Sequence, residues 1–411
     1  PIRVARGSVV DLACNTTGAD IYYTTNGSTP GVSSPVFNPA LGITIYGNTT
    51  VKAVAVKPGL GDSVMLIEEY IVADICAFWE DDVSDTVSTS DWALDPGQYS
   101  VAYGNGRWIA AGPGANGAYS DDGVTWTALN DGWTTIFGSE TINSVASGSN
   151  NRWVAVGSNG KGAYSTNNGE SWNAINSWSG IFGTETINSV AWGDGYWVAV
   201  GSSGQGAYSS GDLAAWTAIT GAGWTSAFSN GANDINSVAY GNGRWIAAGS
   251  GGKGASSTNN GQTWNAINSW SGTFNTESIN SVASGEGYWV AAGSSGRGAY
   301  SGDGATWTAI AGVGWTNTFN AGSINSVAWG NNHWVAVGSN GTGGKGAYST
   351  DGQTWNAITW VDGSDYATIQ TNTTANTYGT EINSAAYGGG RWLAAWTDAS
   401  SSGVTWTKAT N

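Results

Sequence analysis

The chain has few charged residues, cysteines, histidines and prolines for its length of 411 residues. Charged residues make up 10% of it, and it contains two cysteines, one histidine and seven prolines. The spacing of His and Cys excludes a zinc centre, and no cofactor is predicted. No run of 18 apolar residues is present, so we expect no membrane insertion. The missing 3.6-residue apolar period excludes a helical repeat protein.

Basic residues are also scarce, and this limits the possible partners. Acidic residues outnumber basic ones 29 to 13, giving a net charge of -16. Such a surface repels phosphate backbones and anionic lipids, so nucleic acid is not an expected partner. Glycine (64 residues) and tryptophan (25 residues) are abundant instead. A chain with many aromatic side chains and few charges has enough apolar surface to bury, which argues against disorder.

Residues 99–411 repeat one segment seven times at a period of about 45 residues. Each copy reads as four short strands, here called a to d in chain order. In the fourth copy they are expected at Asn236–Tyr240, Arg244–Gly249, Gly254–Ser257 and Thr263–Ile267. The pattern predicts an all-β fold, a seven-bladed β-propeller of four-stranded blades. A linear β-solenoid is the alternative, although its repeats are usually shorter. The copies begin near Tyr99 and at Ile142, Ile187, Ile235, Ile279, Ile324 and Ile382.

Residues 1–72 contain no copy of the repeat and read as a small antiparallel β-sandwich. The run Ile21–Pro30, followed by Thr50–Val56, resembles the immunoglobulin-like module at the C-terminal end of chitobiase-type hexosaminidases. That resemblance implies a non-catalytic module that accompanies secreted or surface carbohydrate-active proteins. Residues 73–98 are acidic, and we expect them to form a linker that packs on the propeller.

Cys14 lies within the N-terminal module, and Cys76 lies just after it. A disulfide between Cys14 and Cys76 would close a loop across one small domain, and two buried free thiols are the alternative. The chain begins at Pro1 without a charged-then-apolar leader, so we expect a mature or excised form. The resemblance of the N-terminal module implies a secreted or cell-surface location.

The turns between strands c and d carry a second resemblance. Ser165–Trp172 and Ser257–Trp264 resemble the Asp-box of bacterial sialidase-type propellers, with Asn in the Asp position. A form one residue shorter keeps the Asp, as in Ser301–Trp307. An Asp or Asn side chain bonds its own turn, and Gly adopts positive φ. The resemblance implies a structural turn on the face opposite an active site.

Propeller topology places the d–a and b–c loops on the other face. Five d–a loops carry a Trp-x3-Phe pair, and five b–c loops carry a long polar residue between glycines. An indole face beside hydrogen-bonding groups suits a sugar ring, so these residues are the candidate ligand contacts. The alternative is that Trp and Phe only fill the core between blades. The candidates are Trp133, Phe137, Trp178, Phe182, Trp224, Phe228, Trp270, Phe274, Trp315, Phe319, Lys161, Gln205, Lys253, Arg297 and Lys345.

The copies also alternate. The second and fourth share the sequence Asn-Ala-Ile-Asn-Ser-Trp-Ser-Gly, whereas the first, third and fifth have a Gly-Trp-Thr loop. Any pockets on this face are therefore expected in two kinds.

An enzyme is not expected. Glycoside hydrolysis needs a carboxylate pair that breaks the repeat symmetry, and Asp362 and Asp365 in the insertion 362–381 are the only candidates. The lone His333 replaces a repeated Arg or Tyr and is interpreted as a surface substitution. The sequence favours non-catalytic, multivalent binding of glycans or glycoproteins. A protein-interaction scaffold is the alternative, and a degraded glycosidase ranks third. The oligomeric state is not predicted.

Overall fold

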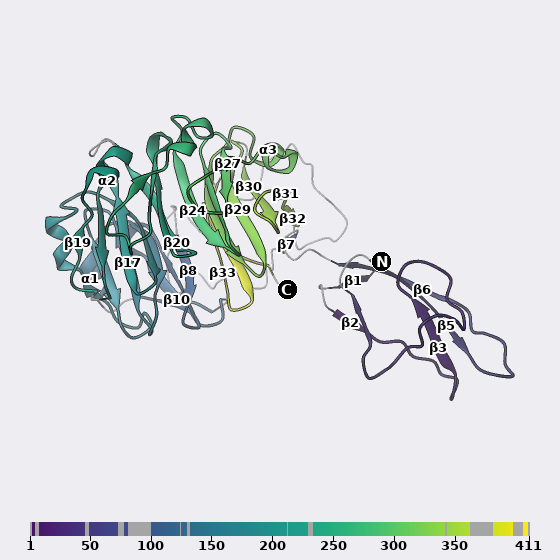
Figure 1. Ribbon diagram of the computed structural model, residues 1–411. Helices are drawn as coiled ribbons and strands as arrows, with labels where there is room; N and C mark the ends of the chain where they lie inside the picture. The colour runs from purple at the N-terminus through teal and green to yellow at the C-terminus, as the bar shows by residue number, and fades with distance from the viewer. Residues whose placement is uncertain are drawn as a thin grey trace. The chain divides into compact units, whose positions relative to one another are not determined.

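The computed structural model describes residues 2–4, 8–45, 49–72, 78–80, 100–123, 125–129, 132–211, 213–228, 233–341, 343–361, 381–397 and 406–409. The chain forms two compact units, one ending at Phe78 and one running from Trp79 to Thr410 (Figure 1).

The first unit is a small β structure. Its four-stranded sheet has the order β1 (Ile2–Val4), β6 (Leu66–Val72), β5 (Thr49–Val56) and β3 (Asp20–Thr24), and β2 (Ser8–Val10) pairs with β4 (Ile43–Ile45). Ile43, Ile45 and Val51 pack together in its core. Strand β1, which the sequence pattern does not predict, pairs in parallel with β6.

Six antiparallel four-stranded sheets follow in the second unit, one for each of the first six copies of the repeat. The order a–b–c–d predicted from the sequence is confirmed, although strand d is only two residues long. The sheets are β8 (Ser100–Gly104), β9 (Arg107–Ala111), β10 (Gly117–Ser120) and β11 (Thr127–Ala128); β12 (Ile142–Ser147), β13 (Trp153–Gly157), β14 (Gly162–Ser165) and β15 (Asn173–Ala174); β16 (Ile187–Gly193), β17 (Tyr196–Gly201), β18 (Gly206–Ser209) and β19 (Thr217–Ala218); β20 (Ile235–Gly241), β21 (Arg244–Gly249), β22 (Gly254–Ser257) and β23 (Asn265–Ala266); β24 (Ile279–Gly285), β25 (Tyr288–Gly293), β26 (Gly298–Ser301) and β27 (Thr308–Ala309); β28 (Ile324–Gly330), β29 (His333–Ser339), β30 (Gly344–Ser349) and β31 (Asn356–Ala357).

The last copy belongs to a five-stranded sheet of mixed origin. Its order is β32 (Thr359–Val361), β7 (Phe78–Glu80), β35 (Trp406–Ala409), β34 (Arg391–Thr397) and β33 (Glu381–Gly388). Leu393 and Ala395 of β34 share a buried cluster with Val101 and Trp108 of the first sheet. The first and last copies of the repeat therefore pack against each other, as a closed propeller-like arrangement requires.

The Ile-Asn-Ser segment at the start of strand a joins neighbouring sheets. Asn188 Nδ2 donates to the Ile235 carbonyl of the next sheet (3.0 Å), and Ser189 Oγ accepts from the Val238 amide (3.1 Å). A register shift between Ile187 and Ser189 turns the asparagine out of the ladder. Corresponding bonds recur between the other sheets (Asn143 to Ile187, Asn236 to Ile279, Asn280 to Ile324, Asn325 to Ile382). The most repeated residues of the sequence are therefore inter-sheet contacts.

The core lies between adjacent sheets and is rich in tryptophan. Strand b of each repeated sheet contributes one Trp to this core. The side chains of Trp153, Trp197 and Trp245, for example, are fully buried. The predicted burial of the strand Trp residues is confirmed wherever the structure describes their side chains. Among the described residues, no helix is long and apolar enough to cross a membrane, and no three His, Cys, Asp or Glu side chains gather as metal ligands.

Candidate ligand-binding loops

The d–a loops come in two structural kinds, matching the alternation in the sequence. Short α-helices follow the first, third and fifth sheets: α1 (Trp133–Phe137), α2 (Ala222–Ala227) and α3 (Val313–Phe319). The second and fourth sheets are followed by 3₁₀ turns, η3 (Asn176–Gly180) and η7 (Asn268–Gly272). The sequence pattern does not predict the three helices, because they are too short to show an apolar period.

The residue after the loop tryptophan distinguishes the two kinds. Thr225 Oγ1 in α2 donates to the Gly221 carbonyl four residues back (3.1 Å), as in an α-helix, and also lies 3.3 Å from the Ala222 carbonyl three residues back. Ser179 Oγ in η3 donates to the Asn176 carbonyl three residues back (3.1 Å), which matches the tighter 3₁₀ spacing. Thr316 and Ser271 repeat these bonds in α3 and η7.

All ten loop aromatics are buried, which favours the alternative that they fill the core, although Trp224 and Phe228 also line a pocket. The largest exposed fraction among them is 3%, at Trp224. The buried set is Trp133, Phe137, Trp178, Phe182, Trp224, Phe228, Trp270, Phe274, Trp315 and Phe319, and their contact with a ligand stays a prediction. Composition and spacing alone do not separate an exposed loop aromatic from one that fills a gap between sheets.

Each loop tryptophan packs between two sheets. Trp178 lies edge-on to Trp216 of the next sheet, with ring centroids 4.8 Å apart, and Trp270 and Trp307 repeat the pair at 4.9 Å. Trp178 also covers Gly162, where a Cβ atom would lie 1.7 Å from Cζ3 of the indole. The second glycine of the Gly-Lys-Gly loops is thus required by packing rather than by a ligand.

The b–c loops lie beside the d–a loops, as the topology predicts. The Gly160 amide donates to the Glu185 carbonyl (2.8 Å), and the Gly296 amide donates to the Gly322 carbonyl (2.6 Å). We call the surface formed by these two sets of loops the loop face.

The long residues of the b–c loops leave the backbone from equivalent positions. The carbonyls of Lys161, Gln205, Lys253 and Arg297 each accept from the glycine four residues earlier, at 2.9–3.0 Å. Their side chains then differ. Lys161 Nζ donates to the Phe137 carbonyl (3.0 Å) and Arg297 Nη1 to the Thr273 carbonyl (2.5 Å), both in the preceding d–a loop. Lys253 is exposed and Lys345 is half-buried.

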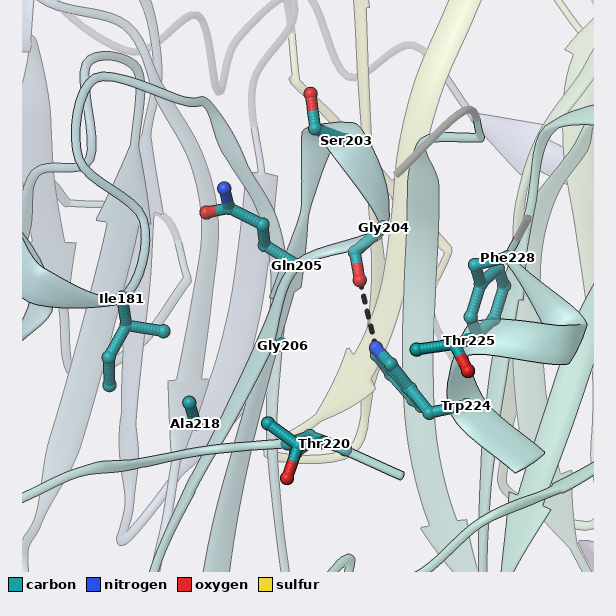
Figure 2. A pocket seen from close by; sticks show the side chains of 11 residues that line it. Ile181, Ser203, Gly204, Gln205, Gly206, Ala218, Thr220, Trp224, Thr225 and Phe228 are labelled. Atoms are coloured by element: carbon teal, nitrogen blue, oxygen red, sulfur yellow. Dashed lines mark hydrogen bonds between the residues drawn. The ribbon is translucent and has the colours of Figure 1, made fainter. Parts of the chain in front are cut away.

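At Gln205 a pocket of about 230 Å³ opens between the loops (Figure 2). Ile181 of the preceding loop and Trp224 and Phe228 of the following one contribute apolar walls. Ser203, Thr220 and Thr225 supply hydroxyl groups. Figure 2 shows the Gln205 amide between Ser203 and Ile181, on the far side of the pocket from helix α2.

The polar groups of this pocket are uncharged, and one of them has no partner. Gln205 Oε1 is buried, and no described group donates a hydrogen bond to it. Trp224 Nε1 donates to the Gly204 carbonyl (2.8 Å), which fixes the indole in the wall. No lining residue is acidic or basic. The pocket brings together Gln205, Trp224 and Phe228 from the predicted set, and Ile181 and the three hydroxyl residues are additions that the sequence pattern does not identify.

The c–d turns form the turn face and are internally satisfied. In the turn of the fifth sheet, Ser301 Oγ donates to Asp303 Oδ1 (3.0 Å) and accepts from the Gly304 amide (2.9 Å). Amide donors from Thr306 and Ala305 lower the pKa of Asp303 from 3.8 to about 2. The same serine-centred bonds recur at Ser120, Ser165, Ser257 and Ser349. This geometry is that of a folding turn.

The repeated arginines also make contacts on the turn face. Arg107 pairs with Asp121 (2.6 Å) and donates to the Asn168 carbonyl of the next sheet (3.1 Å). His333 takes this position in the sixth sheet, is half-buried, and donates from Nδ1 to the Asn331 carbonyl (2.7 Å). Cys14 has no disulfide partner among the described residues. Its proposed partner Cys76 and the acids Asp362 and Asp365 lie outside the described residues, so those predictions stay open.

The comparisons with known proteins support the fold. Residues 3–66 match the family model described as the chitobiase/beta-hexosaminidase C-terminal domain, as the N-terminal resemblance predicts. No curated protein sequence matches the chain.

Solved structures similar to the chain are all distant in sequence. YCF48 from Cyanidioschyzon merolae is 14% identical (TM-score 0.54; 79% of this chain and 98% of that one). YCF48 bound to a D1 peptide is also 14% identical (TM-score 0.53; 77% and 94%). The GH74 xyloglucanase from Xanthomonas campestris is 14% identical (TM-score 0.54; 76% and 55%), so the chain spans about half of that enzyme. At these identities the matches show the fold alone: all-β, with repeated four-stranded sheets in a propeller-like arrangement.

Proposed function

We propose that the protein is a seven-bladed propeller that binds carbohydrate without catalysis, at the pocket around Gln205. The five-stranded sheet of β32, β7, β35, β34 and β33 would be the seventh blade, since its strands β33 and β34 pack against the first sheet. The observation that carries the proposal is the composition of the pocket. An apolar wall and an uncharged polar rim are what the C–H face and the hydroxyls of a sugar ring require.

The size and charge of the pocket define the ligand further. Drug-sized ligands occupy sites of roughly 300–1,000 Å³, so a volume of about 230 Å³ fits one sugar ring. The Gln205 amide and the hydroxyls of Ser203, Thr220 and Thr225 are uncharged groups that can exchange hydrogen bonds with sugar hydroxyls. A neutral ring is favoured, because an acidic sugar would bring a carboxylate to a site without a cationic residue.

Three further points support this proposal. The lining residues include no Asp, Glu or His, so the pocket lacks the paired carboxylates of a glycosidase. The N-terminal domain matches a family described by its place in chitobiase and β-hexosaminidase, which are carbohydrate enzymes. The GH74 structure shows that a similar fold occurs in a xyloglucanase. A secreted or cell-surface location is part of the same proposal.

A glycan array tests the proposal. The parent chain is compared with Gln205→Ala and with Gln262→Ala, which changes an exposed glutamine on the turn face. We expect neutral glycans to be retained by the parent and by Gln262→Ala, and the signal to fall at least tenfold in Gln205→Ala. Retention of no glycan by the parent, or an unchanged signal in Gln205→Ala, would contradict the proposal. Turnover of fluorogenic glycosides by the parent would contradict its non-catalytic part.

Peptide binding is the second candidate function. It is favoured by the structure of YCF48 bound to a D1 peptide, 94% of which this chain covers. A peptide array probed with the same three proteins distinguishes the two functions. Peptide signals that depend on Gln205, with no glycan signals, would assign the pocket to a peptide side chain.

A further inference from the structure

The pocket at Gln205 has a twin position on the loop face, at Arg297. The third sheet is preceded by η3 and followed by α2, and the fifth sheet is preceded by η7 and followed by α3. Trp224 Nε1 donates to the Gly204 carbonyl (2.8 Å), and Trp315 Nε1 donates to the Gly296 carbonyl (2.9 Å). The loops that surround residues 205 and 297 are therefore built in the same way.

The backbone at the two positions is also the same. The Gly201 amide donates to the Gln205 carbonyl (2.9 Å), and the Gly293 amide donates to the Arg297 carbonyl (3.0 Å). Both side chains thus leave the backbone at equivalent positions. In each sheet the preceding loop is a 3₁₀ turn and the following loop is a short helix. What differs between the two positions is the length and charge of one side chain.

That difference determines whether the side chain reaches the preceding loop. Arg297 Nη1 crosses to the Thr273 carbonyl, three residues after the loop tryptophan Trp270. The corresponding residue before the third sheet is Ile181, three residues after Trp178, and it lines the open pocket. A glutamine side chain is two atoms shorter than an arginine, and Gln205 Oε1 has no partner among the described residues. Lys161 occupies the same repeated position in the second sheet. Its Nζ also donates to a carbonyl of the preceding loop, that of Phe137 (3.0 Å).

We propose that the side chain at this repeated position sets which copies of the sugar pocket are open. Gln205 leaves the pocket of the third sheet open, and Arg297 fills a latent copy at the fifth sheet with its own guanidinium group. This deepens the proposed function and rests on it for the class of ligand, a neutral sugar ring. It also changes the expected valency, because long cations at positions 161 and 297 remove two of the repeated sites.

A reciprocal exchange tests the proposal. Gln205→Arg, Arg297→Gln and the double exchange are crystallised without ligand, with Gln262→Arg on the turn face as control. We expect the arginine introduced by Gln205→Arg to bond the loop carbonyl at Ile181 and close the first pocket. The shorter glutamine introduced by Arg297→Gln should leave a pocket open beside Thr273. An introduced arginine that points into solvent above an open pocket, or a pocket that stays filled in Arg297→Gln, would overturn the proposal.

Binding stoichiometry provides the second readout. Each protein is titrated calorimetrically with the methyl glycosides of glucose, galactose, mannose and N-acetylglucosamine. Relative to the parent and the control, the number of sites should fall by one in Gln205→Arg, rise by one in Arg297→Gln and stay the same in the double exchange. Two sites lost or gained together in a single exchange would contradict the independence of the two positions. If the parent binds none of the four glycosides, the proposed function fails, whereas the crystal structures still decide whether position 205 controls the pocket.

Discussion

The two faces of the repeated sheets differ in how regularly their side chains follow the repeat. On the turn face, the serine that opens each described c–d turn is buried, and five of these serines bond the turn glycine in the same way. On the loop face, the residue at the equivalent b–c position is Lys161, Gln205, Lys253, Arg297 or Lys345, and its contacts change with it. Regular positions maintain the fold, and the candidate site lies where one copy departs from the others.

The largest effect should come from the loop aromatic Trp178, because it is buried and packs between two sheets. Trp178→Ala removes a fully buried indole, and we expect a loss of about 3–5 kcal/mol in the free energy of unfolding. Chemical denaturation measures it, with the partly exposed Tyr288→Ala as control. A loss of binding with unchanged stability would show that Trp178 contacts the ligand instead.

The glycines of the b–c loops provide the next test. At Gly162 a new Cβ would lie 1.7 Å from the Trp178 ring, whereas at Gly180 nothing lies within 4 Å. We expect Gly162→Ala to cost about 1–3 kcal/mol through overpacking and Gly180→Ala to be much milder. Equal unfolding free energies for the two variants would show that the glycine is not required by packing.

A turn serine should matter less than the loop tryptophan, and only for stability. Ser301→Ala leaves the Gly304 amide and Asp303 without their shared hydroxyl, at an expected cost of about 1–3 kcal/mol. Sugar binding on the loop face should be unchanged. A binding defect in a folded Ser301→Ala variant would break the separation of the two faces.

The smallest effect is the pH dependence at Asp303. Its pKa in the folded chain, about 2, lies below the ordinary value of 3.8. The carboxylate therefore contributes stability above pH 3.8, and that contribution is lost as the pH falls from 3.8 through 2. Because the side chain is exposed, solvent screening should keep it below ~1 kcal/mol. Asp303→Asn should flatten the unfolding free energy over this pH interval, and an unchanged slope would show that the turn bonds do not favour the charged form.

Much of the fold is predictable from the sequence, because each sheet repeats the same physical pattern. Alternating apolar residues and glycine turns predict the order of the four strands, which the structure confirms. The N-terminal strand β1 is not predictable in this way, since its three residues pair in parallel with a strand far along the chain. Helices as short as α2 are not predictable either, because six residues are too few to show an apolar period.

The site is predictable only in part. Propeller topology places the b–c and d–a loops together, and hydrogen bonds such as that from Gly160 to Glu185 agree with this. The burial of Trp178 and its equivalents depends on contact with the next sheet, which a list of spacings does not contain. The sequence shows that Gln205 stands where four other copies have Lys or Arg. It does not show that Lys161 and Arg297 reach the preceding loop, which is the contact that Gln205 lacks.

A crystal structure of the parent chain with the neutral glycan retained most strongly on the array would test the central claim most directly. We predict one sugar ring in the pocket of the third sheet, with hydroxyl groups within hydrogen-bond distance of the Gln205 amide and a C–H face against the apolar wall that includes Ile181 and Trp224. A ring bound at another position of the loop face, or on the turn face, would contradict the account.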